Sequence, residues 1–275
     1  MSGADERRLW LAAVAAVTAL TLLRLYVVFA TDLNLGPDEA QYWSWSTEPA
    51  FGYFSKPPMI AWIIAGMTSV CGDGEGSIRA ASPLLYAVSA LLIFEAGRLL
   101  YGARVALWSC LAFATLPGVS FSSALMTTDV PLLAFWSAAL LALAAMLRRA
   151  PAESRLIALA LGLAVGLAML SKYAGGYFLL GLALAALIDR RVRAHVLGLN
   201  GVLILAGALA MIAPNIVWNL ENGFATVSHT AYNAGLKGDL FHPDRLAEFA
   251  GAQFGVFGPV LMGVIVAGLA LGLRS

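Results

Sequence analysis

The sequence predicts an all-α polytopic membrane protein with about eight transmembrane helices. Of its 275 residues, 60% are hydrophobic and only 12% are charged, whereas a soluble domain devotes about a quarter of its residues to charge. The mean hydropathy is +0.82, and apolar runs of about twenty residues recur from end to end. The net charge of +1 provides no field that would attract nucleic acid.

Eight apolar runs are the predicted spans: roughly 9–30, 80–97, 105–122, 129–147, 156–170, 173–188, 195–218 and 250–273. The first continues too far beyond Arg7 and Arg8 to be a cleavable signal core, so we expect an uncleaved anchor. The short apolar run 58–70 reaches about 20 Å as a helix, less than a hydrocarbon core of about 30 Å. It predicts an interfacial helix in the first outer loop, and 1–275 is expected to form one transmembrane domain.

The basic residues predict the orientation, because short loops rich in Lys and Arg stay inside. With the N-terminus inside and eight spans, five fall outside: Lys56, Arg79, Lys172, Lys237 and Arg245. Eleven fall inside: Arg7, Arg8, Arg98, Arg104, Arg148, Arg149, Arg155, Arg190, Arg191, Arg193 and Arg274. If 58–70 crossed the membrane, the split would become six inside and ten outside. Most acids fall outside, as do the two long connections, 31–79 and 219–249, so we expect any chemistry to face outward.

Cysteine usage argues against a disulfide framework or a zinc site, since Cys71 and Cys110 are far apart and adjoin no His cluster. Four polar residues of the second outer segment leave a metal site open, although a solvated loop is favoured: His229, Asp239, His242 and Asp244. The Gly162–Gly166 spacing is typical of close helix packing in membranes.

The stretch "GPDEAQYWSWS" places Asp38 and Glu39 directly after Pro37. Proline suits the first turn of a helix, and carboxylates are favoured near its N-terminus. In one interpretation the acids only begin an interfacial helix, with the following Tyr and Trp rings as an aromatic belt. In the other, a positioned carboxylate takes a proton in a reaction. The local sequence leaves both open.

Two further stretches carry candidate residues. In "FGYFSKPPMIAW", Lys56 either extends to the lipid headgroups or provides a cation for a phosphate. In "SSALMTTDVPLL", Asp129 either caps the fourth span, with Pro131 in its first turn, or marks a substrate path or catalytic pocket. Arg24, inside the first span, either reaches the interface or pairs with an acid of the site.

Taken together, these stretches resemble the N-terminal membrane part of glycosyltransferase family 39. This group of the GT-C superfamily includes the protein O-mannosyltransferases, with the lipid A aminoarabinose transferases as close relatives. The resemblance rests on "PDEAQYW", "YFSKPP", "TTDVPLLAFW", "LSKYAGGYFLLG" and "APNIVWNLENGF", in that order, and covers nearly the whole chain. Members of the family are usually longer than 275 residues, so a further C-terminal part is expected.

The resemblance implies a GT-C-type helical bundle and an inverting glycosyltransferase. Its donor is a sugar on a polyprenyl phosphate, and its acceptor is a lipid, glycan or protein on the outer face, in a bacterial inner membrane with the site facing the periplasm. By the resemblance, Asp38 is the catalytic base, Glu39 its partner and Asp129 the second acid. The expected contacts of the lipid phosphate or substrate are Lys56, Lys172, Tyr173, Tyr53 and Arg79. For Lys172, at the turn between the fifth and sixth spans, an extension to the lipid headgroups is the slightly favoured alternative. No cofactor is assigned and a divalent metal is left open, because Ser55 stands where those relatives often carry Glu.

The rival interpretation is a transporter or a flippase of the lipid carrier, with Asp38, Glu39 and Asp129 as ion or proton sites. Transporters tend to hold such charges near the midplane on broken helices and to show internal repeats. Here the acids cluster at the outer rim and no repeat is evident. The sequence therefore favours the transferase.

Overall fold

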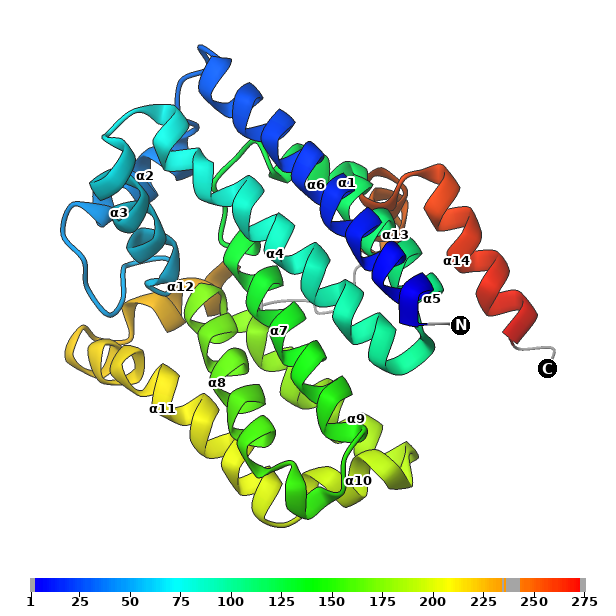
Figure 1. Cartoon of the computed structure of the whole chain (residues 1–275). Coiled ribbons are helices and arrows are strands. Elements are labelled where there is room, and N and C mark those ends of the chain that lie inside the picture. The colour runs from blue at the N-terminus through cyan, green and yellow to red at the C-terminus, as the bar shows by residue number, and fades with distance from the viewer. Residues whose placement is uncertain (1–2, 234, 236–242, 273–275) are drawn as a thin grey trace.

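The computed structural model describes residues 3–233, 235 and 243–272, and this part of the chain is helical throughout apart from its connecting loops (Figure 1). The helices are α1 (Gly3–Ala30), α2 (Pro37–Ser46), α3 (Met59–Cys71), α4 (Glu75–Tyr101), α5 (Ala103–Thr115), α6 (Pro117–Ser122), α7 (Asp129–Leu147), α8 (Arg155–Ser171), α9 (Tyr177–Ile188), α10 (Arg190–Val196), α11 (Leu199–Glu221), α12 (Ala225–Asn233), α13 (Pro243–Phe257) and α14 (Pro259–Gly272), with 3-10 turns η1 (Pro151–Glu153) and η2 (Tyr173–Gly176). The predicted all-α fold is confirmed.

The lengths of the helices support fewer membrane crossings than the eight that the hydropathy pattern predicts. Among the described residues, four helices are long and apolar enough to span a bilayer, namely α1, α4, α7 and α11. A fifth is reached if the bent pair of α13 and α14 counts as one span. Helices α3, α5, α8 and η2–α9 are apolar but shorter. The chain is thus a multi-pass membrane protein.

Three predicted spans are interrupted. The run 105–122 divides between α5 and α6, because Leu116 adopts an extended backbone (φ −51°, ψ 133°) before Pro117, as residues preceding proline favour. In the run 195–218, Gly198 separates α10 from α11 with a φ of 87°. The run 250–273 bends by 112° between α13 and α14, where Gly258 has a φ of 74°. Proline and glycine therefore shorten elements that hydropathy alone predicts as continuous.

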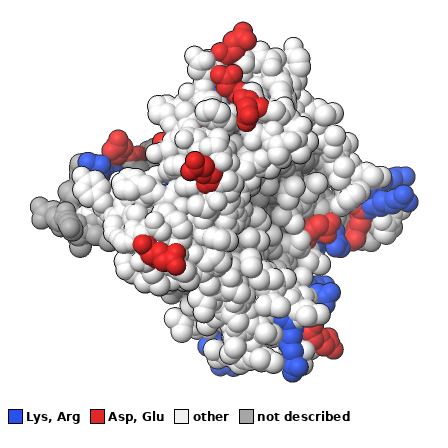
Figure 2. Space-filling view, turned by 90° about the vertical axis from the view of Figure 1, so that its left-hand side faces the viewer, with Lys and Arg blue, Asp and Glu red and all other residues white. Residues whose placement is uncertain are grey.

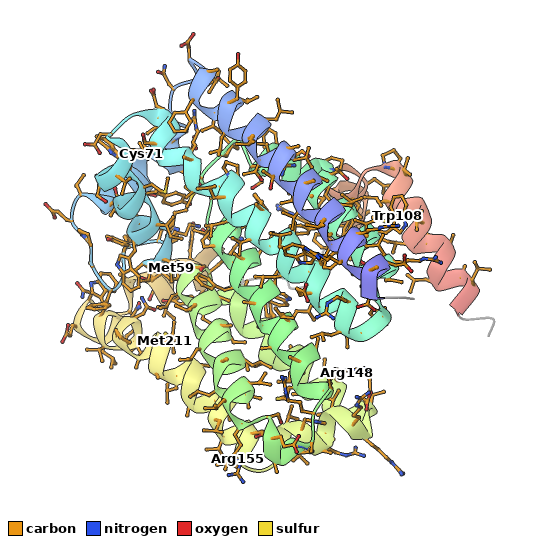
Figure 3. All side chains as sticks on the ribbon, viewed as in Figure 1. Met59, Cys71, Trp108, Arg148, Arg155 and Met211 are labelled. Carbon is orange, nitrogen blue, oxygen red and sulfur yellow. The ribbon has the colours of Figure 1, made fainter. Side chains whose placement is uncertain are left out.

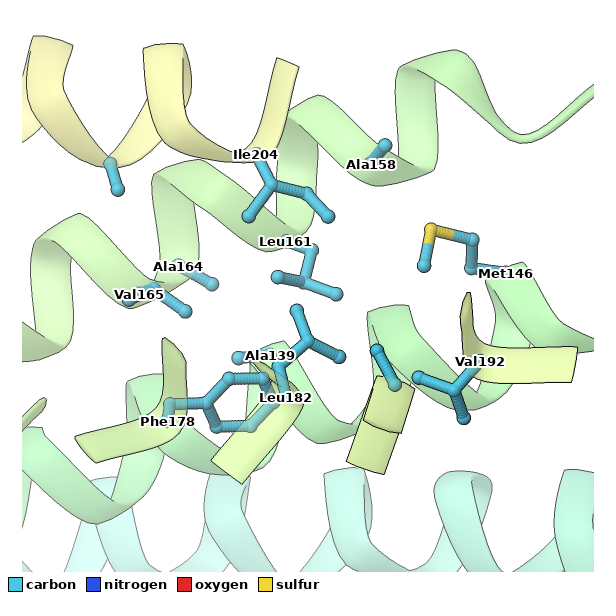
Figure 4. Close-up of a cluster of buried hydrophobic side chains, with 12 residues drawn as sticks. Ala139, Met146, Ala158, Leu161, Ala164, Val165, Phe178, Leu182, Val192 and Ile204 are labelled. Carbon is cyan, nitrogen blue, oxygen red and sulfur yellow. The ribbon is translucent and has the colours of Figure 1, made fainter. Parts of the chain in front are cut away.

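The core forms where α7, α8, α9, α10 and α11 pack together (Figure 4). Leu161 and Val165 of α8 are fully buried between α7 and Ile204 of α11. A Cβ on Gly162 would lie 2.1 Å from the Ile204 carbonyl oxygen, and one on Gly166 would lie 2.5 Å from Met211 Cβ. The predicted role of this glycine pair is confirmed, because only residues without a side chain allow α8 and α11 to approach so closely.

The two ends of the bundle differ in charge. Arg148 and Arg155 lie at the end opposite Met59 and Cys71 (Figure 3). The end that carries Met59 and Cys71 is formed by α2 and α3. Helix α3 packs against both α2 and α4. In Figure 2, acidic atoms without basic ones occupy the upper part of the face, while most basic atoms lie toward its lower and right-hand edges. The labelled residues of the predicted inner connections, Arg148 and Arg155, therefore lie at the other end from Met59 and Cys71 of the first predicted outer loop.

Candidate functional site

A buried ion pair joins α2 to α4. Glu39 Oε2 lies 2.8 Å from Arg79 Nη2, and Glu39 Oε1 accepts from Arg79 Nε at 2.9 Å. Both side chains are at most 5% exposed. The guanidinium also donates to the carbonyls of Leu33 (2.8 Å) and Asn34 (2.9 Å). All of these bonds fix the segment that leads into α2.

Glu39 also holds the segment that precedes α7. Its Oε1 accepts the backbone N–H of Met126 at 3.0 Å, and its Oε2 accepts that of Gly36 at 3.0 Å. Burial alone would raise the pKa of this carboxyl, but the hydrogen bonds from Arg79 and from these amides outweigh it and lower the pKa. Glu39 is therefore a charged clamp that ties the start of α2 to the loop before Asp129.

Asp38, the neighbouring acid, is exposed. It lines a cavity of about 410 Å³ together with Leu125, Met126 and Thr127. Tyr42 is buried one turn along α2, and burial followed by the negative charges of Asp38 and Asp129 raises its pKa to about 12. The fold therefore brings two carboxylates that are ninety-one positions apart in the chain near enough to one tyrosine for both charges to raise its pKa.

Asp129 begins α7 and accepts a charged hydrogen bond from Lys172 (Nζ to Oδ1, 2.8 Å). Both side chains are nearly half exposed, so the pair contributes little to stability and can exchange partners. Next to Lys172, the Tyr173 hydroxyl donates to Asn215 Oδ1 at 2.8 Å and accepts from Asn219 at 3.2 Å. The tyrosine therefore joins η2 to the C-terminal end of α11.

Lys56 lies in the loop between α2 and α3 and is partly buried. No acid in the described part of the chain forms an ion pair with it, so its ammonium remains available for an anion. Its carbonyl accepts the Tyr53 N–H at 3.2 Å. The Tyr53 hydroxyl accepts the Ala50 N–H at 3.0 Å and lies 3.0 Å from the carbonyl of Trp45, to which it donates.

The structure shows which groups several of the candidate side chains contact. Glu39 was expected as the supporting partner of Asp38, and Arg79 as a contact of the lipid phosphate or substrate. In the structure both side chains are buried and bonded to each other and to backbone groups. Tyr53 was expected near the lipid phosphate, but its hydroxyl is used inside its own loop. Arg24 was expected at the interface or on an acid, but it donates to the Ala114 carbonyl at 2.6 Å, at the C-terminus of α5 where a cation is favoured.

Three residues of the site were not among the candidates named from the sequence. Tyr42 belonged to the aromatic-belt interpretation, but its side chain is buried and the charges of Asp38 and Asp129 raise its pKa. Asn215 and Asn219 belong to the quoted "APNIVWN" block and are four residues apart in α11. Two amides on one face of an apolar helix could have identified them in the sequence, because buried polar groups need hydrogen-bond partners.

Metal ligands are not assembled in the described part of the chain, where no three His, Cys, Asp or Glu side chains gather. His229 lies 5.0 Å from the Phe54 ring, between centroids, and hydrogen-bonds Asn233. Asp239 and His242 lie outside the described residues, as does the side chain of Asp244.

The fold and the site together define a polytopic helical membrane protein with a carboxylate–lysine site at one end. The model of the dolichyl-phosphate-mannose-protein mannosyltransferase family matches residues 55–218. The chain belongs to this family.

Comparisons with individual proteins agree with this family membership. The chain is 38% identical over 254 residues to lipid A galacturonosyltransferase RgtD of Rhizobium johnstonii, covering 89% of this chain and 51% of that protein. It is 30% identical to lipopolysaccharide core galacturonosyltransferase RgtA of the same organism, covering 78% and 42%. The crystal structure of ArnT from Cupriavidus metallidurans bound to undecaprenyl phosphate superposes with a TM-score of 0.73 at 24% identity, covering 95% and 51%. The chain thus spans about half the length of these relatives.

Proposed function

We propose that this protein is an inverting glycosyltransferase that moves a sugar from a polyprenyl phosphate to an acceptor on the outer face of the membrane. The observation that carries the proposal is an exposed carboxylate, Asp38, in the wall of a cavity of about 410 Å³ that is also lined by Leu125, Met126 and Thr127, the segment leading to Asp129. Asp38 is exposed to that cavity, while Glu39 and Arg79 hold the helix that presents it.

The proposed reaction is a single displacement at the anomeric carbon. Asp38 accepts the proton of an acceptor hydroxyl, whose oxygen forms the new bond to carbon. The electron pair of the broken carbon–oxygen bond leaves with the carrier phosphate. That phosphate is a good leaving group, so it needs a cation and not an acid. Lys56 is available for this role, and Lys172 can join it by leaving Asp129.

The substrates are suggested by the relatives. RgtD is named as a lipid A galacturonosyltransferase, and the ArnT structure holds undecaprenyl phosphate. We infer that this chain uses a polyprenyl-phosphate-linked sugar, with galacturonic acid as the first donor to test and lipid A as the first acceptor. No cofactor enters this proposal.

A direct assay tests the proposal. The purified protein is mixed in detergent with undecaprenyl-phosphate galacturonic acid and lipid A, and the products are resolved by mass spectrometry. The transferase yields glycosylated lipid A and free undecaprenyl phosphate in equal amounts. A transporter or flippase would instead move lipid across the bilayer of a vesicle without producing a glycosylated acceptor.

The topology that places the site outside is also proposed. We expect eight crossings, formed in part by the shorter and bent helices, within one transmembrane domain. In a variant without Cys71 and Cys110, a single Cys at position 48 should react with a membrane-impermeant thiol reagent in intact cells, whereas one at 191 should react only after lysis. Labelling of 191 but not 48 in intact cells would show the opposite orientation.

Lys56→Ala should weaken the use of the lipid-linked donor without harming assembly. The ammonium has no acidic partner in the described structure, so its removal exposes no buried charge. Loss of one charge-assisted hydrogen bond to phosphate should raise the donor KM about tenfold or more. Steady-state kinetics at limiting donor measure this, with Lys56→Arg as the variant that keeps the charge. A donor KM equal to that of the wild type would assign Lys56 to the headgroup region.

A further inference from the structure

A second cavity, of about 430 Å³, opens at the C-terminal end of α2. Its wall includes Ser44, Trp45, Thr47, Glu48 and Trp218. We propose that it binds an uncharged sugar unit of the acceptor, so that the acceptor is held at a second point away from the reacting hydroxyl. This inference rests on the proposed function.

The lining has the chemistry that a sugar needs. A pyranose has a flat apolar C–H face and a rim of hydroxyls. The Trp45 and Trp218 rings provide apolar surfaces with a polar edge. Ser44 offers a hydroxyl that donates and accepts, Thr47 offers an acceptor because its hydroxyl donates to the Ser44 carbonyl at 2.8 Å, and Glu48 offers two acceptor oxygens. The volume lies within the range of about 300–1,000 Å³ typical of small-molecule sites.

The cavity wall is rigid before anything binds. The Trp45 and Tyr53 rings stack with centroids 4.8 Å apart and planes 7° from parallel. Trp218 lies against Gly52, where a Cβ would come within 2.3 Å of the indole. The Asn215 amide donates to the Phe51 carbonyl at 2.7 Å, which anchors the same loop to α11. A site whose aromatic side chains are already fixed loses little entropy on binding.

The charge of the lining selects against the donor phosphate. Glu48 is exposed, and no Lys or Arg among the described residues lines this cavity. A phosphate there would meet a carboxylate without a compensating cation, which is unfavourable. The available cations, Lys56 and Lys172, belong to the donor site instead. The cavity therefore suits a hydroxylated, uncharged ligand.

Helix α2 connects this cavity to the catalytic acid. Trp45 follows Asp38 by seven residues, which places it about 10 Å along the helix and within about 20° of the same face. A lipid-linked saccharide that presents one hydroxyl to Asp38 can span that distance with its next sugar. The short, stiff helix sets the spacing between the reacting unit and the second contact.

Kinetics with lipid A as acceptor test the inference. Glu48→Gln removes the charge without changing size, and Ser44→Trp fills the cavity from an exposed position. Both variants should raise the KM for lipid A about tenfold or more, with the donor KM unchanged. Glu221→Gln, an exposed acid at the outer end of α11 that does not line the cavity, is the matched control. An unchanged KM for lipid A in both variants would overturn the proposal.

A binding measurement separates this inference from the proposed function. N,N′-diacetylchitobiose, an uncharged disaccharide, should raise the Tm of the wild type by mass action but not that of Ser44→Trp, and inorganic phosphate should not replace it. If the wild type transfers no sugar and this pattern still holds, the saccharide site stands while the transferase assignment fails. Stabilisation of both proteins alike, or by phosphate alone, would refute the saccharide site.

Discussion

Asp38→Asn is expected to abolish glycosyl transfer while leaving the protein folded in the membrane. Asn keeps the size of Asp and begins helices equally well, and Asp38 is exposed, so the structural cost is small. An amide cannot accept the proton of the attacking hydroxyl. Positioned acid–base groups contribute about 10²- to 10⁴-fold to rate, and we expect a loss of kcat within that range, measured with purified protein.

The matched control for this experiment is Asp73→Asn, which changes another exposed acid of the first outer loop. It should transfer sugar at the wild-type rate. Thermal unfolding and gel filtration of both variants should match those of the wild type. If Asp38→Asn turned over at the wild-type rate, Asp38 would not be the base. The acids of the "GPDEAQYWSWS" stretch would then only begin a helix.

Glu39→Gln should have the largest effect on stability. The change leaves the Arg79 guanidinium buried without its counter-charge, and breaking a buried pair in this way costs about 3–5 kcal/mol. It also weakens the hydrogen bond to the Met126 amide. The start of α2, with Asp38, should therefore separate from the segment that leads to Asp129. We expect a clearly lower Tm in detergent and reduced activity, in contrast to the intact fold of Asp38→Asn.

Two controls isolate the buried pair. Glu95→Gln breaks a partly exposed pair of the same length, Glu95–Arg98 at 2.8 Å, and should cost no more than about 1 kcal/mol. The double variant Glu39→Gln with Arg79→Met removes both charges and should recover part of the lost stability. Equal stability of Glu39→Gln and the wild type would contradict the role of Glu39 as a clamp.

The pH dependence of stability provides a further check on the same pair. The pKa of Glu39 in the folded protein lies below its ordinary value of 4.5. The carboxylate therefore stabilises the fold fully above pH 4.5, and this contribution is lost as the pH falls through the folded-state pKa. The Tm of the wild type should fall in that acidic window, and that of Glu39→Gln should fall less steeply.

Periodicity and composition were enough to predict the helical bundle and the short apolar helix α3. They did not predict that 105–122, 195–218 and 250–273 are each divided between two helices, because the apolar run continues through the position where the helix is interrupted. Hydropathy is a sum over residues and does not register one extended or positive-φ position. Leu116, Gly198 and Gly258 each interrupt a helix without lowering the apolar content.

The sequence by itself determined that this is a multi-pass helical membrane protein, and it placed Asp38, Lys56, Asp129 and Lys172 among the candidate residues, because hydropathy and short motifs are local properties. Only the tertiary structure decided how these residues are used. Both Asp38 and Glu39 line the same cavity, but Glu39 is buried in a pair with Arg79, forty positions away, whereas Asp38 is exposed. Burial and charge pairing depend on which helices meet in space, and this separates two adjacent acids into a clamp and a candidate base.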